Sequence, residues 1–471
     1  MHVTTIDRCR LRPGRFLTWA VDPGDARPRM SDVPPSFNQS MHLAAAGTHS
    51  TWLAAAFTVD HRIDRDALGR AYQALITRHG TLRSSFVRDG DRIARTEFVP
   101  SDLRVAANPE VVVTGESTLR QTIWGAMEVA CHPFGFPAYL FGAIDRDDTS
   151  TILCGFDHAH VDAYSISIVI DDLHRLYDGF ARGIVTSGDE LGMSGNFIDY
   201  CAAEAGAPLV PPSDPRLRGW LHFFDNSDGV PPQFPLDLGV APGERAPQAA
   251  GTRRMLSAAS TEQFAHLCRD NGSSVFGGML SMMAESVRRC GGGPELALLF
   301  PMHTRHSEPW RNAVGWFTTN APLRVVSSGD AMSTIRRTGP ALRRAVRLGE
   351  VPVPQVISAM GGLNRVRDDI FMVSYVDYRR LPGAERHAEI DAQHISNVTA
   401  ADDAQFWISR TDDGLWIRSR FPDTRQARTA IDEFLGHVDG ELRKVLAEAG
   451  TRIIGDLAIG SRVSTASTAS G

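Results

Sequence analysis

A histidine and an aspartate stand four residues apart where an apolar run ends. The run covers residues 151–156, Asp157 and His158 follow it, and Asp162 comes four residues after His158. Imidazole titrates near neutral pH, so His158 could take a proton from a hydroxyl or an amine and return it later. The carboxylate of Asp162 could hold the loop or the ring in place. We therefore interpret His158 as a candidate general base.

The elements around this pair are expected to place it at the end of a buried strand. Strands are predicted over 139–144 and 151–156, joined as a hairpin, and a helix over 166–180 is expected to pack behind the His158 loop. His160 would share the face of His158 only if the backbone stayed extended. It could either support His158 from behind or be a solvated loop residue, and we favour the second interpretation.

The chain is too long for a single ordinary core. It has 471 residues, and two α+β halves of similar size are expected. We predict an N-terminal lobe over 1–205, a proline-rich crossing segment over 206–250, a C-terminal lobe over 251–460 and a small polar, disordered tail over 461–471. Within the second lobe, a helix over 331–348 is expected to break or kink at Pro340.

Composition excludes several classes of protein. The net charge is −6, whereas proteins whose main partner is nucleic acid usually carry a basic face. No run approaches the roughly 18 consecutive apolar residues of a membrane span, and the first residues do not resemble a signal peptide. The six cysteines are scattered without zinc-site spacing. These features predict a reduced, cytoplasmic protein without a bound metal.

The segment around His158 resembles the HHxxxDG signature of the condensation-domain and acyltransferase superfamily. The second histidine of that signature is the catalytic one and corresponds to His158, and its aspartate corresponds to Asp162. The sequence departs from the signature at two positions: Asp157 stands in place of the first histidine, and Ala163 in place of the glycine.

Two further segments resemble boxes of the same superfamily. Residues 78–86 are similar to an RHxxLRTxF box, which we interpret as structural. Residues 313–325 resemble an (I/V)GxFVNTxPLR box, which implies a strand lining a substrate tunnel. The resemblance also implies that the motif aspartate forms a salt bridge with an arginine of the C-terminal half, and Arg324 is our candidate partner for Asp162. The predicted tunnel residues are Asp157, Trp316, Thr318, Asn320 and Ser374.

A narrower resemblance is to the polyketide-associated (Pap-type) acyltransferases of actinobacteria. It is carried by residues 216–239 and by shorter runs at 33–40, 351–356 and 371–375. Some members of that group acylate trehalose derivatives. The resemblance implies an α/β (α+β) fold of two chloramphenicol-acetyltransferase-like lobes arranged as a V, with an active-site tunnel between them.

The same resemblance implies an acyltransferase. The acyl donor would be a thioester, either acyl-CoA or an acyl group on the phosphopantetheine arm of a carrier protein. The acceptor would be a hydroxyl of a trehalose-like sugar or of a natural product. His158 would be the base, and no metal or tightly bound cofactor is expected.

Three other interpretations remain open at this point. A free-standing condensation enzyme would use the same chemistry to form an amide with an amine acceptor. A non-catalytic relative would bind a carrier protein without catalysis. An unrelated α/β enzyme would carry these boxes by coincidence.

Overall fold

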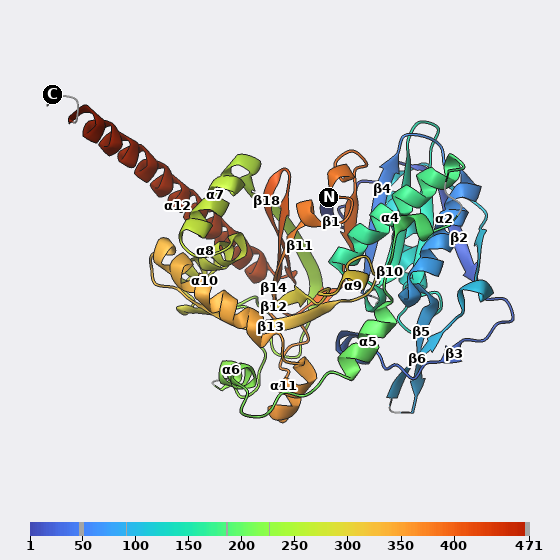
Figure 1. Ribbon diagram of the computed structural model, residues 1–471, viewed down its shortest axis with the longest axis horizontal. Coiled ribbons are helices and arrows are strands. Elements are labelled where there is room, and N and C mark those ends of the chain that lie inside the picture. Colours follow the sequence, from blue (N-terminus) through green and yellow to red (C-terminus); the bar gives the residue numbers. More distant parts are fainter. Residues whose placement is uncertain (47–50, 91, 185–186, 226, 467–471) are drawn as a thin grey trace. The chain divides into compact units, whose positions relative to one another are not determined.

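The chain forms two compact units, each built from separate stretches of sequence. The computed structural model describes the backbone of residues 1–46, 51–90, 92–184, 187–225 and 227–466, and side chains as far as residue 449. Unit 1 comprises Met1–Pro208, His303–Thr319 and Tyr378–Thr399, and unit 2 comprises Leu209–Met302, Asn320–Asp377 and Ala400–Gly471 (Figure 1).

The predicted lobes therefore need correction. Two stretches of the predicted C-terminal lobe belong to unit 1, because the chain returns there twice. The proline-rich segment 206–250 is not a separate connection, since it belongs to unit 2 from Leu209 onward. It contains helix α6 (Pro215–Phe224), in which Pro215 occupies the first turn and Asp214 caps the amino end.

Unit 1 is organised by an eight-stranded sheet in the order β1-β15-β4-β10-β9-β2-β7, with β8 also paired to β2. The central strand β4 is apolar and buried along almost its whole length, as expected of a strand covered on both faces. Strand β15 comes from the last unit 1 stretch and lies between β1 and β4. The strands are β1 (His2–Thr5), β2 (Gly14–Asp22), β4 (Trp52–Val59), β7 (Arg104–Ala107), β8 (Val111–Val113), β9 (Tyr139–Asp145), β10 (Ser150–Asp157) and β15 (Gln393–Ser396).

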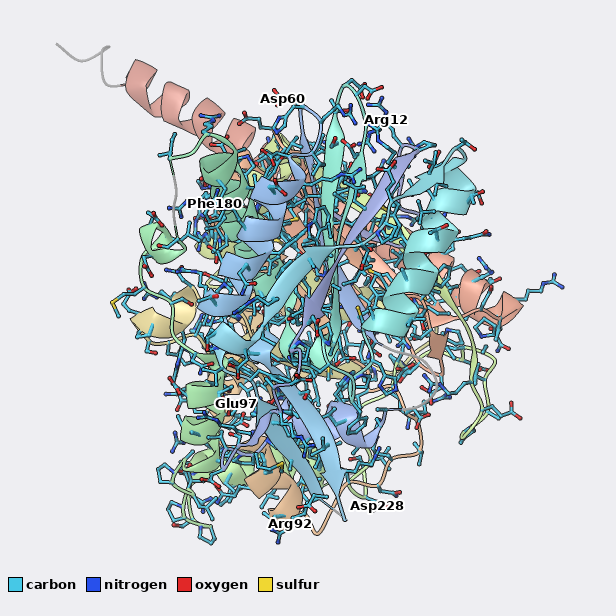
Figure 2. The ribbon with its side chains drawn as sticks, turned by 90° about the vertical axis from the view of Figure 1, so that its right-hand side faces the viewer. Arg12, Asp60, Arg92, Glu97, Phe180 and Asp228 are labelled. Atoms are coloured by element: carbon cyan, nitrogen blue, oxygen red, sulfur yellow. The ribbon has the colours of Figure 1, made fainter. Side chains whose placement is uncertain are left out.

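Helices α2 and α4 pack side by side in unit 1, and α4 also contacts β4 (Figure 1). A small sheet of order β3-β6-β5 completes the unit, with Arg92 and Glu97 at the two ends of β6 (Figure 2). The remaining elements of unit 1 are α1 (Phe37–Ala44), α2 (Arg65–Arg78), α3 (Glu116–Ala130), α4 (Ala163–Ala181), α5 (Phe197–Ala205), α9 (Glu308–Arg311), β3 (Arg29–Met30), β5 (Ser84–Asp89), β6 (Arg92–Glu97) and the 3-10 turns η1 (Gly80–Arg83), η2 (Pro100–Asp102), η3 (His158–His160), η4 (Asp189–Leu191), η5 (Tyr378–Arg380) and η6 (Ala384–Arg386).

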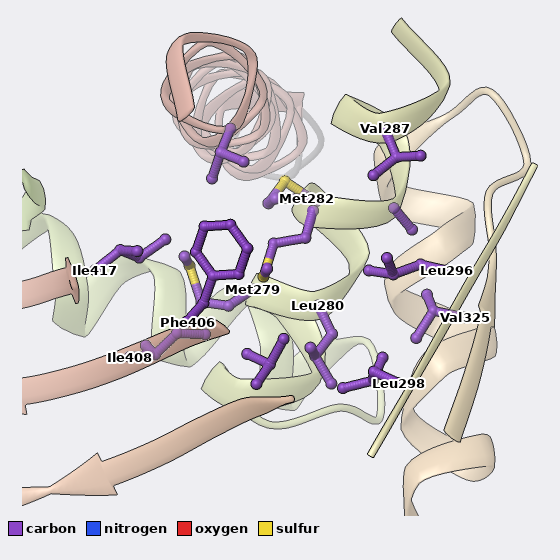
Figure 3. Packing of buried hydrophobic residues seen from close by; sticks show 14 of the residues in the cluster. Met279, Leu280, Met282, Val287, Leu296, Leu298, Val325, Phe406, Ile408 and Ile417 are labelled. Carbon is purple, nitrogen blue, oxygen red and sulfur yellow. The ribbon is translucent and has the colours of Figure 1, made fainter. Parts of the chain in front are cut away.

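Unit 2 has a five-stranded sheet of order β14-β17-β18-β11-β16, and the pair β12-β13 lies mainly in the same unit. Its core forms around α8, which directs Met279 and Met282 toward Phe406 and Leu280 toward Leu298 (Figure 3). The elements are β11 (Ala246–Ser257), β12 (Glu295–His303), β13 (Thr318–Val326), β14 (Val373–Asp377), β16 (Ala400–Ala401), β17 (Gln405–Thr411), β18 (Gly414–Pro422), α7 (Ala258–Asp270), α8 (Val275–Arg289), α10 (Ala331–Leu348), α11 (Val353–Ala359) and α12 (Arg425–Ala466).

Two local predictions in unit 2 are corrected. Helix α10 continues past Pro340, so the predicted break is wrong, while the alternative of a kink there stays a prediction. The predicted disordered tail 461–471 is helical as far as Ala466, and its last residues, 467–471, lie outside the described part of the chain. Among the helices that the structure describes, none is both long enough and apolar enough to cross a membrane.

Phe406 tests the core of unit 2. Its ring is 1% exposed and packs against the rings of Phe234, Phe371 and Phe434. We expect Phe406→Ala to lower the free energy of unfolding by about 3–5 kcal/mol, because it removes buried surface and leaves a cavity. The matched control is Val346→Ala, whose side chain is 41% exposed, with an expected change within about 0.5 kcal/mol. Urea unfolding measures both, and equal effects would contradict this description of the core.

Candidate active site

His158 lies where strand β10 turns into helix α4. The strand ends at Asp157, the 3-10 turn η3 follows, and α4 begins at Ala163. The backbone N–H of His158 donates to Thr51 O at 2.9 Å, so the histidine is bonded to the residue that precedes β4. Asp162 caps α4 by accepting from Ser165 N at 2.7 Å. The predicted hairpin and helix around His158 are thus confirmed.

The imidazole of His158 is stacked on an indole. Its ring centroid is 3.9 Å from that of Trp316, and the ring planes are 29° apart. Nδ1 of His158 is buried, whereas the residue as a whole is partly exposed. Burial, followed by the neighbouring His42, lowers the pKa of His158 below its ordinary value. A lowered pKa keeps the ring neutral near pH 7, the form that a general base needs.

The carboxylate of Asp162 pairs with Arg305. Arg305 Nη1 donates to Oδ2 at 2.7 Å and Nη2 to Oδ1 at 3.0 Å, and the two side chains are 1% and 6% exposed. Phe317 N also donates to Asp162, at 3.0 Å. Burial alone would raise the pKa of Asp162, but Arg305 and the hydrogen bonds hold it below its ordinary value.

The predicted salt bridge between Asp162 and Arg324 is therefore wrong. Arg324 belongs to unit 2, where its guanidinium donates to Glu295 at 3.0 Å and to Phe223 O at 2.7 Å. Leu323 and Val325 on either side of it are buried in the core of unit 2. Since side chains alternate along a strand, Arg324 points away from that core.

The segment His303–Thr319 is tied into unit 1 next to His158. Ser165 Oγ donates to Gly315 O at 2.7 Å, and Arg305 Nη2 donates to Ser165 Oγ at 2.8 Å. A Cβ at Gly315 would lie 2.3 Å from the Phe197 ring, so only glycine permits this approach. These contacts fix the backbone on one side of Trp316, and the bond from Phe317 to Asp162 fixes the other.

Asp157 is fully buried and is hydrogen-bonded both to its own turn and to helix α1. Its Oδ1 accepts from Ala159 N at 2.9 Å, and His42 Nε2 lies 2.9 Å from the same oxygen. Helix α1, which carries His42, contacts the site twice more. Gln39 Nε2 donates to Ala159 O at 2.8 Å, and Asn38 Nδ2 donates to Thr318 O at 2.7 Å.

The structure thus brings three of the predicted tunnel residues, Asp157, Trp316 and Thr318, together with His158 in unit 1. The other two are in unit 2. Asn320 lies on β13, and Ser374 lies on β14 opposite Trp407 of β17. Their role in a tunnel stays a prediction. Among the described residues, no group of three or more His, Cys, Asp or Glu side chains could hold a metal ion.

The favoured prediction of a solvated loop residue at His160 is wrong. It is fully buried, and its Nδ1 lies 3.1 Å from Thr81 Oγ1. Burial lowers its pKa to about 4. The structural interpretation of residues 78–86 is confirmed, since His79 is buried against Asp172 at 2.8 Å, and Leu82 and Phe86 belong to the core.

Two residues of the site were missed from the sequence. Arg305 stands between His303 and His306 in a segment that resembles a surface loop, and only its basic charge hinted at an acidic partner. His42 is 115 residues from Asp157 and belongs to no box. No local pattern could have identified it.

Comparison with known proteins places this geometry in a family. The condensation domain family model matches residues 38–401. Acyltransferase PapA3 of Mycobacterium tuberculosis is 26% identical over 436 residues, covering 89% of this chain and 90% of that protein. Trehalose-2-sulfate acyltransferase PapA2 of Mycobacterium bovis is 24% identical over 457 residues, covering 92% and 95%. The solved structure of PapA2 acyl transferase has a TM-score of 0.84 at 22% identity, covering 95% of this chain and all of that one.

The buried pair of Asp162 and Arg305 predicts a large stability effect. We expect Asp162→Asn or Arg305→Met to lower the free energy of unfolding by about 3–5 kcal/mol, because each leaves a buried charge without its partner. The double variant should lose less than the sum of the two. Arg324→Met is the control and should cost about 1 kcal/mol or less, since its ion pair is partly exposed. Urea unfolding of wild type and the four variants measures these losses. A larger loss of stability in Arg324→Met than in Arg305→Met would contradict the assignment of Arg305 as the partner of Asp162.

Proposed function

We propose that this chain, which belongs to the condensation domain family, transfers an acyl group from a thioester to a hydroxyl of a sugar such as trehalose. The observation that carries the proposal is the state of His158. It is the catalytic position of the family signature, its ring is held against Trp316, and its lowered pKa favours the neutral base. The names of the relatives support acyl transfer, and PapA2 supports a trehalose-type acceptor.

In the proposed mechanism, His158 transfers one proton. Nε2 accepts the proton of the acceptor hydroxyl while the oxygen attacks the thioester carbonyl carbon and forms the new C–O bond. The tetrahedral intermediate then collapses, the C–S bond breaks, and the imidazolium returns the proton to the departing thiolate. Both steps occur within one complex of donor and acceptor, so no acyl-enzyme forms. The products are an ester and a free thiol.

Asp162 has a positioning role in this mechanism. Its carboxylate is already engaged by Arg305, Ser165 N and Phe317 N, and its pKa is lowered. A carboxylate with these bonds is a poor proton acceptor, so we assign proton transfer to His158 alone. The Phe317 N–H is likewise engaged by Asp162, which leaves it unsuited as an oxyanion donor.

The donor is proposed to be acyl-CoA or an acyl group on a carrier protein's phosphopantetheine arm. Both present the same thioester to His158. Two alternatives give different products in the same assay. An amine acceptor would yield an amide, which mass spectrometry of the intact product distinguishes from an ester, and a non-catalytic carrier-binding relative would yield no acceptor-dependent thiol.

Thiol release tests the proposal directly. Wild type should release thiol from an acyl-CoA or an acylated phosphopantetheine donor only when trehalose or another sugar acceptor is present. His158→Ala should lower this rate by roughly 10²–10⁴-fold, the usual contribution of a general base. The control is His222→Ala, whose side chain is 84% exposed in unit 2, and it should leave the rate unchanged. Full activity in His158→Ala would contradict the mechanism.

The pH dependence tests the state of the base. Because the neutral form of His158 is active and its pKa is lowered, kcat/KM should be constant near pH 7 and fall only as the pH drops below about 6.5, the ordinary value for histidine. Steady-state rates between pH 4.5 and 8 measure this limb. An acidic limb centred above pH 7 would show that His158 is more basic than its surroundings imply.

A further inference from the structure

The buried aspartate at the position of the first motif histidine is paired with an imidazole from elsewhere in the chain. Asp157 is 0% exposed at the end of β10. His42 Nε2 lies 2.9 Å from its Oδ1 and 3.2 Å from its Oδ2, so one N–H of the ring is shared by both oxygens. A carboxylate buried at the end of an apolar strand is costly without a charged or hydrogen-bonding partner, and His42 provides one.

His42 is held in this position independently of Asp157. Helix α1 begins with a capping box, in which Ser36 and Gln39 are hydrogen-bonded to each other's backbone N–H. Gln39 and Asn38 bond the backbone on either side of the site, at Ala159 O and Thr318 O. The His42 ring therefore arrives on a fixed helix rather than on a loop.

The pair also belongs to the surroundings of His158. The ring centroid of His42 is 6.3 Å from that of His158 and 5.9 Å from that of Trp316, against which His158 is stacked. Among the described residues of unit 1, the titratable side chains that act on His158 are His42, Asp157 and Asp162. Asp157 is paired with His42, and Asp162 is paired with Arg305.

We infer that His42 is a positioning residue of this site: paired with Asp157, it supplies from α1 the imidazole that the motif lacks at its first position, and it balances the charge beside His158. That His42 aids catalysis rests on the proposed function. Its effect on the ionisation of His158 does not, because that effect exists in the protein without substrate.

The charges give the inference a sign. Loss of His42 removes a neighbour that lowers the pKa of His158 and leaves Asp157, which raises it. His42→Gln should therefore raise the pKa of His158. Asp157→Asn should move it in the opposite direction. In the double variant both effects are absent, so His158 should titrate closer to wild type than in either single variant.

Titration of the histidine rings by NMR tests this without any substrate. The sample is the full chain labelled at histidine Cε1, and the His158 signal is assigned by its absence from His158→Gln. The control is His61→Gln, which breaks an exposed pair with Asp60 at 3.1 Å and should leave the titration of His158 unchanged. Circular dichroism confirms that each variant is folded.

The expected result is the opposed shifts of the single variants and their cancellation in the double variant. Where wild type releases thiol, the acidic limb of kcat/KM should move in the same directions. An unchanged titration of His158 in both single variants would overturn the inference, as would a double variant displaced further than either one. If wild type is inactive with every donor and acceptor, the proposed function fails, while the NMR titration still decides whether the pair acts on His158.

Discussion

The ion pair between Asp162 and Arg305 is the interaction on which the arrangement of this site depends. Two charges removed from water are costly, and their mutual attraction offsets that cost only when the geometry is good and further hydrogen bonds complete it. Here the pair is bidentate, and Asp162 also accepts from Ser165 N and Phe317 N. Any displacement of one partner leaves the other charge buried. The two chain segments that carry them are therefore locked to each other.

The ion pair between Asp162 and Arg305 determines the position of His158. Asp162 caps the first turn of α4, so the turn between β10 and α4 has both ends fixed. Arg305 brings the segment His303–Thr319 to the same point, and its bonds through Ser165 to Gly315 set the backbone that carries Trp316. The indole then covers the face of His158 at 3.9 Å. The proposed proton transfer would need a ring of defined orientation, and stacking on Trp316 gives the His158 ring such an orientation.

The sequence indicated those parts of the site whose signals are local. An apolar run of strand length ending in Asp157 and His158, followed by helical periodicity, defines a strand, a turn and a helix that pack together. Arg305 was not found, because the resemblance pointed to Arg324. The alternation of side chains along β13 turns Arg324 away from the core of unit 2, whereas the return of residues 303–319 to unit 1 is a property of the whole topology. The predicted boundaries of the two lobes differ from the units for the same reason, since the return of distant segments to unit 1 leaves no local pattern in the sequence.

Position 157 shows why a sequence motif is better compared with a family signature by the chemical groups it places in space than by its residues one by one. Aspartate in place of histidine changes both charge and shape at a fully buried position. The structure places the imidazole of His42 against Asp157, and the helix that carries His42 is bonded to the same turn through Gln39. A buried carboxylate needs a donor close by, so Asp157 and His42 constrain each other. A departure from a signature is thus informative about function only once its partner has been found, and here that partner is 115 residues away.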